Sequence, residues 1–305
     1  MEFEPRDRAA YLPGPDSLVC ADLHVGRDAT SNVEFRVGER EDLLERFGAL
    51  CERYEPAEAV VAGDLLHSFD RLPTGAAGTI HALRDAAGAV DCRLVVTPGN
   101  HDSMLQELWD GPTTDEYRLE AGDETVVVTH GHAPPSSDAD WYVVGHDHPA
   151  LEVEGMRRPC YLYGPAAYGS AGVLMLPAFS RLPAGVAVNE MYAADFQSPL
   201  VEGNSWVRSA ASSRTIGRSP SVPSTSGDWK SAAYISLTAT PAGRRLNAGS
   251  ISTPAEPYAA VNEMYAADFQ SPLVEETDGL RPVVRDEAAD RTHEFPPLDE
   301  FRRLL

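Results

Sequence analysis

Five short motifs rich in aspartate and histidine recur in the first half of this chain, and each directly follows a run of β-forming residues. The motifs are Asp22-Leu-His24, Gly63-Asp64, Gly99-Asn100-His101-Asp102, His130-Gly-His132 and Gly145-His146-Asp147-His148. Seven of the nine histidines of the chain lie within these motifs or just beside them. Because ligands of open α/β sheets bind beyond the carboxyl ends of the strands, we expect the motifs to converge on one site.

The sequence around the motifs predicts alternating strands and helices. Short β-rich runs predict strands at Ser17–Ala21, Ala59–Ala62, Leu94–Thr97, Thr125–Thr129, Trp141–Val144 and Gly172–Leu176. Apolar residues recur at helical spacing in Glu39–Tyr54, and a weaker helical pattern covers Thr79–Ala87. Such alternation is typical of layered α/β folds, which is the fold class that we predict.

The composition predicts a cytoplasmic protein. No run of about 18 apolar residues occurs in the 305-residue chain, so we expect no transmembrane helix and no association with a membrane. The N-terminal residues lack the apolar core of a signal peptide. The four cysteines form no CxxC pair, and we expect reduced, buried thiols at Cys20, Cys51, Cys92 and Cys160.

The net charge of −22 is the strongest compositional signal. Lys230 is the only lysine, and all other basic residues, histidine apart, are arginine. A strongly acidic, nearly lysine-free chain resembles haloarchaeal cytoplasmic proteins. Since the Debye length is only about 3 Å in molar salt, the global charge does not exclude an anionic substrate.

Fifteen residues occur twice without a change, at Val188–Glu202 and at Val261–Glu275. The segment between the copies is rich in Ser, Thr, Pro, Gly and Ala, and it holds six basic and two acidic residues. Its composition is typical of a disordered linker. We interpret it as a recent insertion or as an artefact of the gene sequence, with a basic tether for nucleic acid as the alternative. We therefore predict three parts: a core at 1–202, a low-complexity insertion at 203–260, and a region at 261–305 with the second copy, a closing strand at Gly279–Arg285 and an acidic tail.

The residue types in the motifs predict a site for divalent cations. The Asp64 carboxylate can bridge two cations, because each of its oxygens can serve a different one. Mixed imidazole, carboxylate and amide ligands suit Mn²⁺, Fe or Zn²⁺ better than Ca²⁺. Gly63, Gly99 and Gly145 stand beside the candidate ligands, where they permit tight turns and leave room for a phosphate to approach.

In this order the motifs resemble those of the calcineurin-like metallophosphoesterase superfamily, whose pattern is DxH…GD…GNHD/E…H…GHxH. The resemblance covers about residues 15–180 and a closing strand near the C-terminus. It implies a four-layer α/β/β/α sandwich with two mixed sheets. It also implies a phosphoric ester hydrolase that uses two divalent metal ions, with Mn²⁺ as the expected metal and Zn²⁺ or Fe as alternatives.

The resemblance further implies a role for each motif residue. One cation would be held by Asp22, His24, Asp64 and His148, and the other by Asp64, Asn100, His130 and His146. A water or hydroxide between the cations would attack phosphorus in line. His101 would protonate the leaving oxygen, and Asp102 would orient its imidazole.

Three nearby residues are candidates for contact with the substrate, and each has a simpler alternative. His132 contacts substrate or is a loop residue, whereas His130 is the preferred ligand because it directly follows a predicted strand. His67 contacts phosphate or is an ordinary loop histidine. Arg27 clamps a substrate phosphate or lies on the surface.

Four further segments, ADLHVG, GHDHPA, LPAFS and GVAVN, narrow the resemblance. They are similar to an archaeal and bacterial branch of phosphoesterases that is related to the nuclease subunits of double-strand-break repair complexes and is associated with DNA ligases or helicases. The branch implies a phosphodiester substrate, with DNA as the candidate. A phosphomonoesterase, a metal-binding scaffold without turnover and a gene product broken by the insertion are the alternatives.

Overall fold

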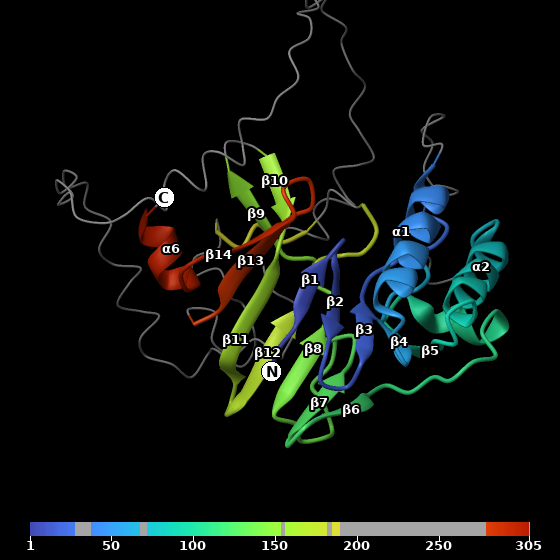
Figure 1. The fold of residues 1–305 in the computed structure, drawn as a ribbon, viewed down its shortest axis with the longest axis horizontal. Coiled ribbons are helices and arrows are strands. Elements are labelled where there is room, and N and C mark those ends of the chain that lie inside the picture. Colours follow the sequence, from blue (N-terminus) through green and yellow to red (C-terminus); the bar gives the residue numbers. More distant parts are fainter. Residues whose placement is uncertain (28–37, 68–71, 154–155, 182–184, 190–278, 305) are drawn as a thin grey trace, which may run out of the picture. The chain divides into compact units, whose positions relative to one another are not determined.

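The described part of the chain contains two large β-sheets with helices on their outer faces and a separate two-stranded sheet (Figure 1). The computed structural model describes residues 1–27, 38–67, 72–153, 156–181, 185–189 and 279–304. Among the helices in these ranges, none has the length and apolar character that a membrane crossing requires. All four cysteines are buried free thiols, as expected.

The first sheet has five strands in sequence order. They are β1 (Glu4–Arg6), β2 (Ala9–Leu12), β3 (Ser17–Cys20), β4 (Glu58–Ala62) and β5 (Arg93–Thr97). The strands β1, β2 and β3 pair antiparallel, whereas β3, β4 and β5 run parallel. All four residues of β3 are buried, because strands of the parallel part of a sheet are covered on both faces.

The second sheet has seven strands in the order β14-β13-β11-β12-β8-β7-β6. Their bounds are β6 (Tyr117–Ala121), β7 (Glu124–Val128), β8 (Trp141–Val144), β11 (Tyr161–Tyr168), β12 (Ala171–Met175), β13 (Arg281–Asp286) and β14 (Arg291–Glu294). The central strands β7, β8 and β12 run parallel, and the outer pairs are antiparallel. Both sheets are therefore mixed, as predicted.

Two helices cover the outer face of the first sheet. Helix α1 (Glu39–Tyr54) has the predicted bounds, and it buries Leu43, Phe47 and Leu50 on one face at helical spacing. Helix α2 (Ala76–Gly88) begins three residues before the predicted start, after Gly75 in a left-handed conformation (φ 83°). The Gly-Ala-Ala-Gly stretch that opens α2 carries no capping side chain, which explains why the sequence misplaced its start.

Three apolar cores separate four layers. One core lies between α1, α2 and the first sheet, and it includes Phe47, Ile80 and Phe179. A second core lies between the two sheets. The third lies on the outer face of the second sheet, where helix α6 (Leu298–Leu304) contributes Leu298 and Phe301. The predicted α/β/β/α sandwich is confirmed.

The hairpin and the C-terminal elements complete the second half of the fold. The hairpin β9 (Ala150–Val153) and β10 (Met156–Pro159) follows the last motif, and the sequence did not predict it. Strand β13 covers the stretch for which a closing strand was expected, and β14 and α6 lie in the stretch interpreted as an acidic tail. The segment 203–260 and the second copy lie outside the described residues, so the boundaries of the three parts stay a prediction. Of the first copy, Val188 and Asn189 are described, and both bond to the β9 backbone.

Candidate metal centre

The five motifs lie directly after parallel strands of both sheets. Asp22 and His24 follow β3, Asp64 follows β4, Asn100, His101 and Asp102 follow β5, His130 follows β7, and His146 and His148 follow β8. Parallel strands bring their carboxyl ends to one edge of a sheet, so each sheet presents its motifs together. The expected convergence of the motifs therefore follows from the topology.

Five of the predicted metal ligands have a left-handed backbone. Their φ angles are 57° at Asp22, 47° at His24, 48° at Asp64, 73° at His146 and 47° at His148. Residues with a Cβ rarely adopt this conformation, and the surrounding structure must hold it. All five positions lie within four residues of the ends of β3, β4 and β8, so the left-handed backbone bends the chain shortly after each strand.

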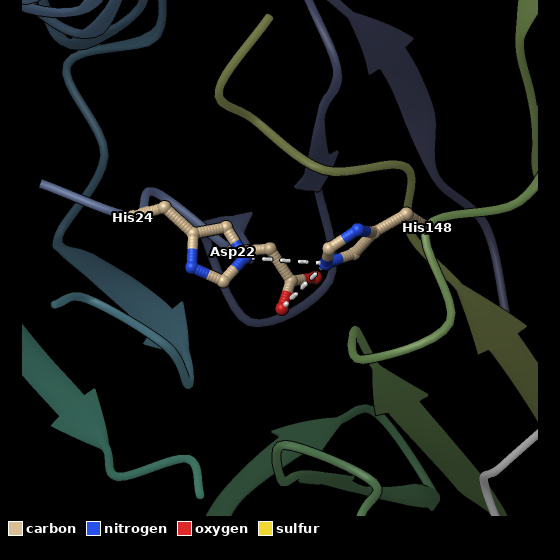
Figure 2. A group of neighbouring side chains, drawn as sticks. All are labelled: Asp22, His24 and His148. Atoms are coloured by element: carbon tan, nitrogen blue, oxygen red, sulfur yellow. Dashed lines mark hydrogen bonds and ion pairs between the residues drawn. The ribbon is translucent and has the colours of Figure 1, made fainter. Parts of the chain in front are cut away.

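Asp22, His24 and His148 form one group of candidate ligand atoms (Figure 2). His148 Nε2 lies 3.3 Å from Asp22 Oδ1 and 3.4 Å from Nε2 of His24. The three residues are at most 5% exposed, and their ligand atoms lie within 4.8 Å of one another. With metal–ligand distances of about 2 Å, atoms this close can share one cation.

His130 lies at the centre of a second group. Its Nε2 lies 3.4 Å from Asp64 Oδ1, 3.0 Å from Asn100 Oδ1 and 3.1 Å from Nδ1 of His146. The other ring nitrogen, Nδ1, lies 3.1 Å from the carbonyl oxygen of Ala62, to which it donates. This bond fixes Nε2 as the nitrogen with a free lone pair, which is the state in which an imidazole binds a metal.

Asp64 belongs to both halves of the site. One set of mutually close ligand atoms joins it to His24 and His101, and another joins it to Asp22 and His130. Its Oδ2 lies 3.7 Å from His101 Nε2, while Oδ1 faces His130. Asp64 therefore takes part in two sets of close ligand atoms, which is the position that a bridging carboxylate requires.

The electrostatics of these groups fit a cation. Burial and the nearby Asp22 carboxylate raise the pKa of Asp64 to about 9, since two buried carboxylates resist ionising together. Burial lowers the pKa of His146 to about 3 and that of His130 to about 4, which keeps both imidazoles neutral. Within the described residues, Asp22 Oδ1 is buried without a hydrogen-bond partner. A divalent cation would satisfy this oxygen and neutralise both carboxylates.

The hydrogen bonds of Asp102 run to the backbone of two loops, and its predicted role toward His101 stays a prediction. Its carboxylate accepts three backbone N–H groups, from Leu65 (3.2 Å), Leu66 (2.8 Å) and Gly99 (2.8 Å). The imidazole of His101 directs Nδ1 to the carbonyl oxygen of His67 at 2.9 Å. Asp102 therefore ties the loop after β4 to the loop after β5, and a backbone carbonyl orients His101.

Three glycines next to the motifs each pack against a candidate ligand from another motif. A Cβ at Gly99 would overlap Asp64 Oδ1, and a Cβ at Gly63 would overlap the imidazole of His130. A Cβ at Gly145 would overlap Asp22. These glycines therefore leave room for neighbouring ligands, whereas the sequence had suggested room for phosphate.

The candidate substrate-contacting residues differ in placement. The His67 ring is 5.6 Å from the His24 ring and 6.2 Å from the His101 ring, so it borders the site. His132 is exposed, and its ring is 5.2 Å from that of His130. Arg27 Nη1 lies 3.6 Å from Glu39 Oε1 in an ion pair, with only 16% of the Arg27 side chain exposed. Arg27 is therefore a partly buried, paired residue.

Sequence reasoning missed one residue that touches a motif backbone. Ser180, after β12, donates from Oγ to the carbonyl oxygen of Asp22 at 2.8 Å. Ser180 is the last residue of the LPAFS segment, which contributed to the resemblance, but it is a single hydroxyl in an apolar stretch and no charge or spacing pattern assigns it a role at the site.

One family model and several solved structures are similar to this chain. Residues 17–150 match the family described as calcineurin-like phosphoesterase. No curated protein matches the chain. The crystal structure of the nuclease MPE of Pseudomonas putida is 24% identical, with a TM-score of 0.45, and the match covers 60% of this chain and 89% of that chain. Yfce, a phosphoesterase from E. coli, is 19% identical, with a TM-score of 0.35 and coverage of 55% and 81%. Since both TM-scores are below 0.5, neither likeness assigns an activity to this chain.

Residues 17–150 are a calcineurin-like metallophosphoesterase domain. The protein is accordingly a metal-dependent phosphoester hydrolase, and the family that residues 17–150 match implies a centre with two divalent metal ions. The grouped Asp and His side chains fit such a centre, because they combine neutral imidazoles with two carboxylates in a buried place.

Proposed function

We propose that this protein is a phosphodiesterase that acts on nucleic acid or nucleotides with two divalent metal ions. The observation that carries the proposal is the position of Asp64, which belongs to two of the sets of mutually close ligand atoms among the described residues. One ion is assigned to Asp22, His24, Asp64 and His148, and the other to Asp64, Asn100, His130 and His146. Two such ions, when bound, supply Lewis acids for the phosphoryl oxygens and lower the pKa of an attacking water.

The protein groups around the ions position them and handle protons. The bond from His130 Nδ1 to the carbonyl of Ala62 holds the ring in the tautomer that presents Nε2 to the site. The carbonyl of His67 does the same for His101 by accepting from Nδ1. The remaining nitrogen of His101, Nε2, faces Asp64 at 3.7 Å. Because Nδ1 keeps its proton in the bond to His67, His101 would act as the acid in its imidazolium form, in which Nε2–H would pass its proton to the leaving oxygen of the ester and leave the neutral ring.

The choice of a diester over a monoester rests on the segments ADLHVG, GHDHPA, LPAFS and GVAVN, which resemble a branch related to repair nucleases. The other details of the proposal also rest on the sequence. The ligand types and the resemblance suggest Mn²⁺, and the branch resemblance suggests DNA as the substrate and a DNA ligase or helicase as the partner. The composition suggests a cytoplasmic, halophilic setting. A metal-binding scaffold without turnover is the second candidate. The retention of His101 at the centre favours the enzyme, since a scaffold needs no group to protonate a leaving oxygen.

Hydrolysis of two model esters tests the proposal. The full chain is assayed with Mn²⁺, in low salt and in molar KCl, on bis-p-nitrophenyl phosphate and on p-nitrophenyl phosphate. We expect Mn²⁺-dependent hydrolysis of the diester that falls by more than about 100-fold in Asp64→Asn and in His101→Ala. His81→Ala, an exposed histidine on α2, serves as the matched control and should keep full activity.

Each alternative has its own outcome. Hydrolysis of the monoester alone would favour a phosphomonoesterase. Folded, Mn²⁺-loaded protein that turns over neither ester nor single-stranded or duplex DNA would contradict the enzyme and favour the scaffold. If the diester is cleaved, a DNA substrate labelled at one end distinguishes cleavage from an end from cleavage within the strand.

A further inference from the structure

The segment after β12 crosses from the second sheet to the first and bonds to the backbone of a candidate metal ligand. Phe179 N donates to the carbonyl oxygen of Ala21 at 2.8 Å. Ser180 N and Ser180 Oγ both donate to the carbonyl oxygen of Asp22, at 3.3 Å and 2.8 Å. Ser180 is 1% exposed and Asp22 is fully buried, so water does not replace these bonds.

Two arginines donate hydrogen bonds to the backbone carbonyl oxygens of this segment. Arg8 donates from Nη1 to the carbonyl oxygens of Ala178 and Ser180. Arg46, on α1, donates from Nη2 to the carbonyl oxygen of Phe179 at 2.8 Å, and its guanidinium lies 4.3 Å from the centre of the Phe179 ring. All three carbonyls of residues 178–180 thus accept from arginine. We call Arg8 and Arg46 the arginine clamp.

Within the arginine clamp, the side chain of Arg46 is held in place by burial and by further hydrogen bonds. Arg46 is 9% exposed, and it also bonds to Asp42 Oδ2 at 3.0 Å and to the carbonyl oxygen of Asp7 at 3.3 Å. A guanidinium is rigid and planar, so several bonds to it fix the positions of its partners. Ser180 is therefore presented to Asp22 from a fixed backbone.

Asp22 needs such support more than an ordinary strand residue does. Its φ of 57° is in the left-handed region, which a residue with a Cβ keeps only when its surroundings enforce it. The N–H of Asp22 donates to the carbonyl oxygen of Gly63 at 3.1 Å, and Oδ2 accepts from the N–H of His146 at 3.0 Å. The bonds to its own carbonyl are those that Ser180 supplies.

We propose that Ser180 is a positioning residue for the metal centre, which holds the carbonyl of Asp22 and thereby the carboxylate that binds one of the two ions. The inference rests on the proposed function, because it takes Asp22 as a ligand. Partners that orient metal ligands typically change metal affinity by about 10- to 100-fold when they are removed. Asp22 is assigned to one ion only, so the loss should fall mainly on one of the two binding events.

Mn²⁺ binding to the full chain tests this inference. The electron paramagnetic resonance signal of free Mn²⁺ is followed during titration of the wild type, Ser180→Ala, Ser180→Thr and Ser180→Val. Thr and Val have nearly the same shape, and of the two only Thr keeps the hydroxyl donor. Ser17→Ala is the matched control, because Ser17 is a buried serine at the opposite end of β3 whose Oγ bonds to the carbonyl of Pro15 at 3.1 Å.

We expect wild type, Ser180→Thr and Ser17→Ala to bind two Mn²⁺ ions with similar affinities. Ser180→Ala and Ser180→Val should bind one of the two ions about 10- to 100-fold more weakly. Equal Mn²⁺ binding by Ser180→Thr and Ser180→Val would overturn the positioning role while leaving the metal centre intact. An equal loss at both ions would also overturn it, since that indicates a general loosening of the fold. If the wild type binds no Mn²⁺, the proposed centre fails and this inference fails with it.

Discussion

The Asp64 carboxylate occupies the space that a side chain at residue 99 would need. A Cβ placed on Gly99 would overlap Asp64 Oδ1, and it would also lie close to the backbone nitrogen of Asp64. The loops after β4 and β5 therefore approach each other at the point where two motifs meet. Glycine at 99 is thus required by the position of a ligand on the neighbouring strand.

The first prediction is that Gly99→Ala lowers both stability and metal binding. The added methyl group must displace the Asp64 carboxylate or separate the two loops, and overpacking of this kind costs about 1–3 kcal/mol in the free energy of unfolding. Urea denaturation in EDTA measures the first effect, and the stoichiometry of bound Mn²⁺ measures the second.

The matched control for this substitution is Gly48→Ala. Gly48 lies inside α1, where an added Cβ meets no atom within 4 Å. Replacing glycine by alanine in a helix should raise the free energy of unfolding by up to about 1 kcal/mol and leave Mn²⁺ binding unchanged. Similar behaviour of the two variants would contradict the steric account of Gly99.

The second prediction is that replacing Asp102 lowers the stability of the fold rather than changing the orientation of His101. Asp102→Asn replaces an acceptor of three backbone N–H groups with an amide whose NH₂ faces some of those donors. Leaving buried donors unsatisfied costs about 1–3 kcal/mol each, so we expect a clear loss in the urea midpoint. If Asp102 instead acted by orienting His101, kcat would fall while the unfolding midpoint stayed at the wild-type value.

The third prediction concerns Asp64 without metal. Burial and the Asp22 carboxylate disfavour the ionised form of Asp64, so its neutral isostere should not destabilise the metal-free protein. In EDTA we expect Asp64→Asn to match or exceed the wild type by up to about 1 kcal/mol, as is common when a functional site is relieved of strain.

Adding Mn²⁺ should reverse that order. At a free Mn²⁺ concentration 100 times the dissociation constant, the wild type should gain about 2.7 kcal/mol per bound ion. Asp64→Asn should gain much less, because the asparagine oxygen carries no charge for a bridge. A variant that is less stable than the wild type in EDTA would contradict the electrostatic account.

The fourth prediction distinguishes His130 from His132. His130 is fully buried with Nε2 facing Asp64 and Asn100, whereas His132 is exposed. We therefore expect His130→Ala to lose one of two Mn²⁺ ions and His132→Ala to keep both. Calorimetric titration with Mn²⁺ gives the two stoichiometries directly, and loss of an ion only in His132→Ala would reverse the assignment.

The local pattern of apolar residues was sufficient to predict helix α1 and the strands that directly precede the motifs. The period of apolar residues placed α1 at its observed bounds, and the predicted central strands of both sheets lie within a residue or two of the observed ones. These segments bury continuous apolar runs or one helical face, which is the signal that a sequence carries most clearly. The other strands, β1, β2, β6, β9, β10, β11 and β14, were missed. Most of them are short or partly polar and obtain their order from pairing with neighbours, whereas Gly164 and Pro165 interrupt the apolar run of β11.

The sequence by itself determined the chemistry of the site, since imidazole, carboxylate and amide groups at strand ends define what the protein can bind. The tertiary structure decided which atoms meet. His24 and His148 are 124 residues apart, and Ser180 and Asp22 are 158 apart, yet each pair is in contact. It also decided that the Asp102 carboxylate accepts from three backbone N–H groups and that His101 Nδ1 donates to the carbonyl oxygen of His67. Hydrogen-bond partners depend on distances of a few tenths of an ångström, and these are set by the packing of two sheets against each other rather than by spacing along the chain.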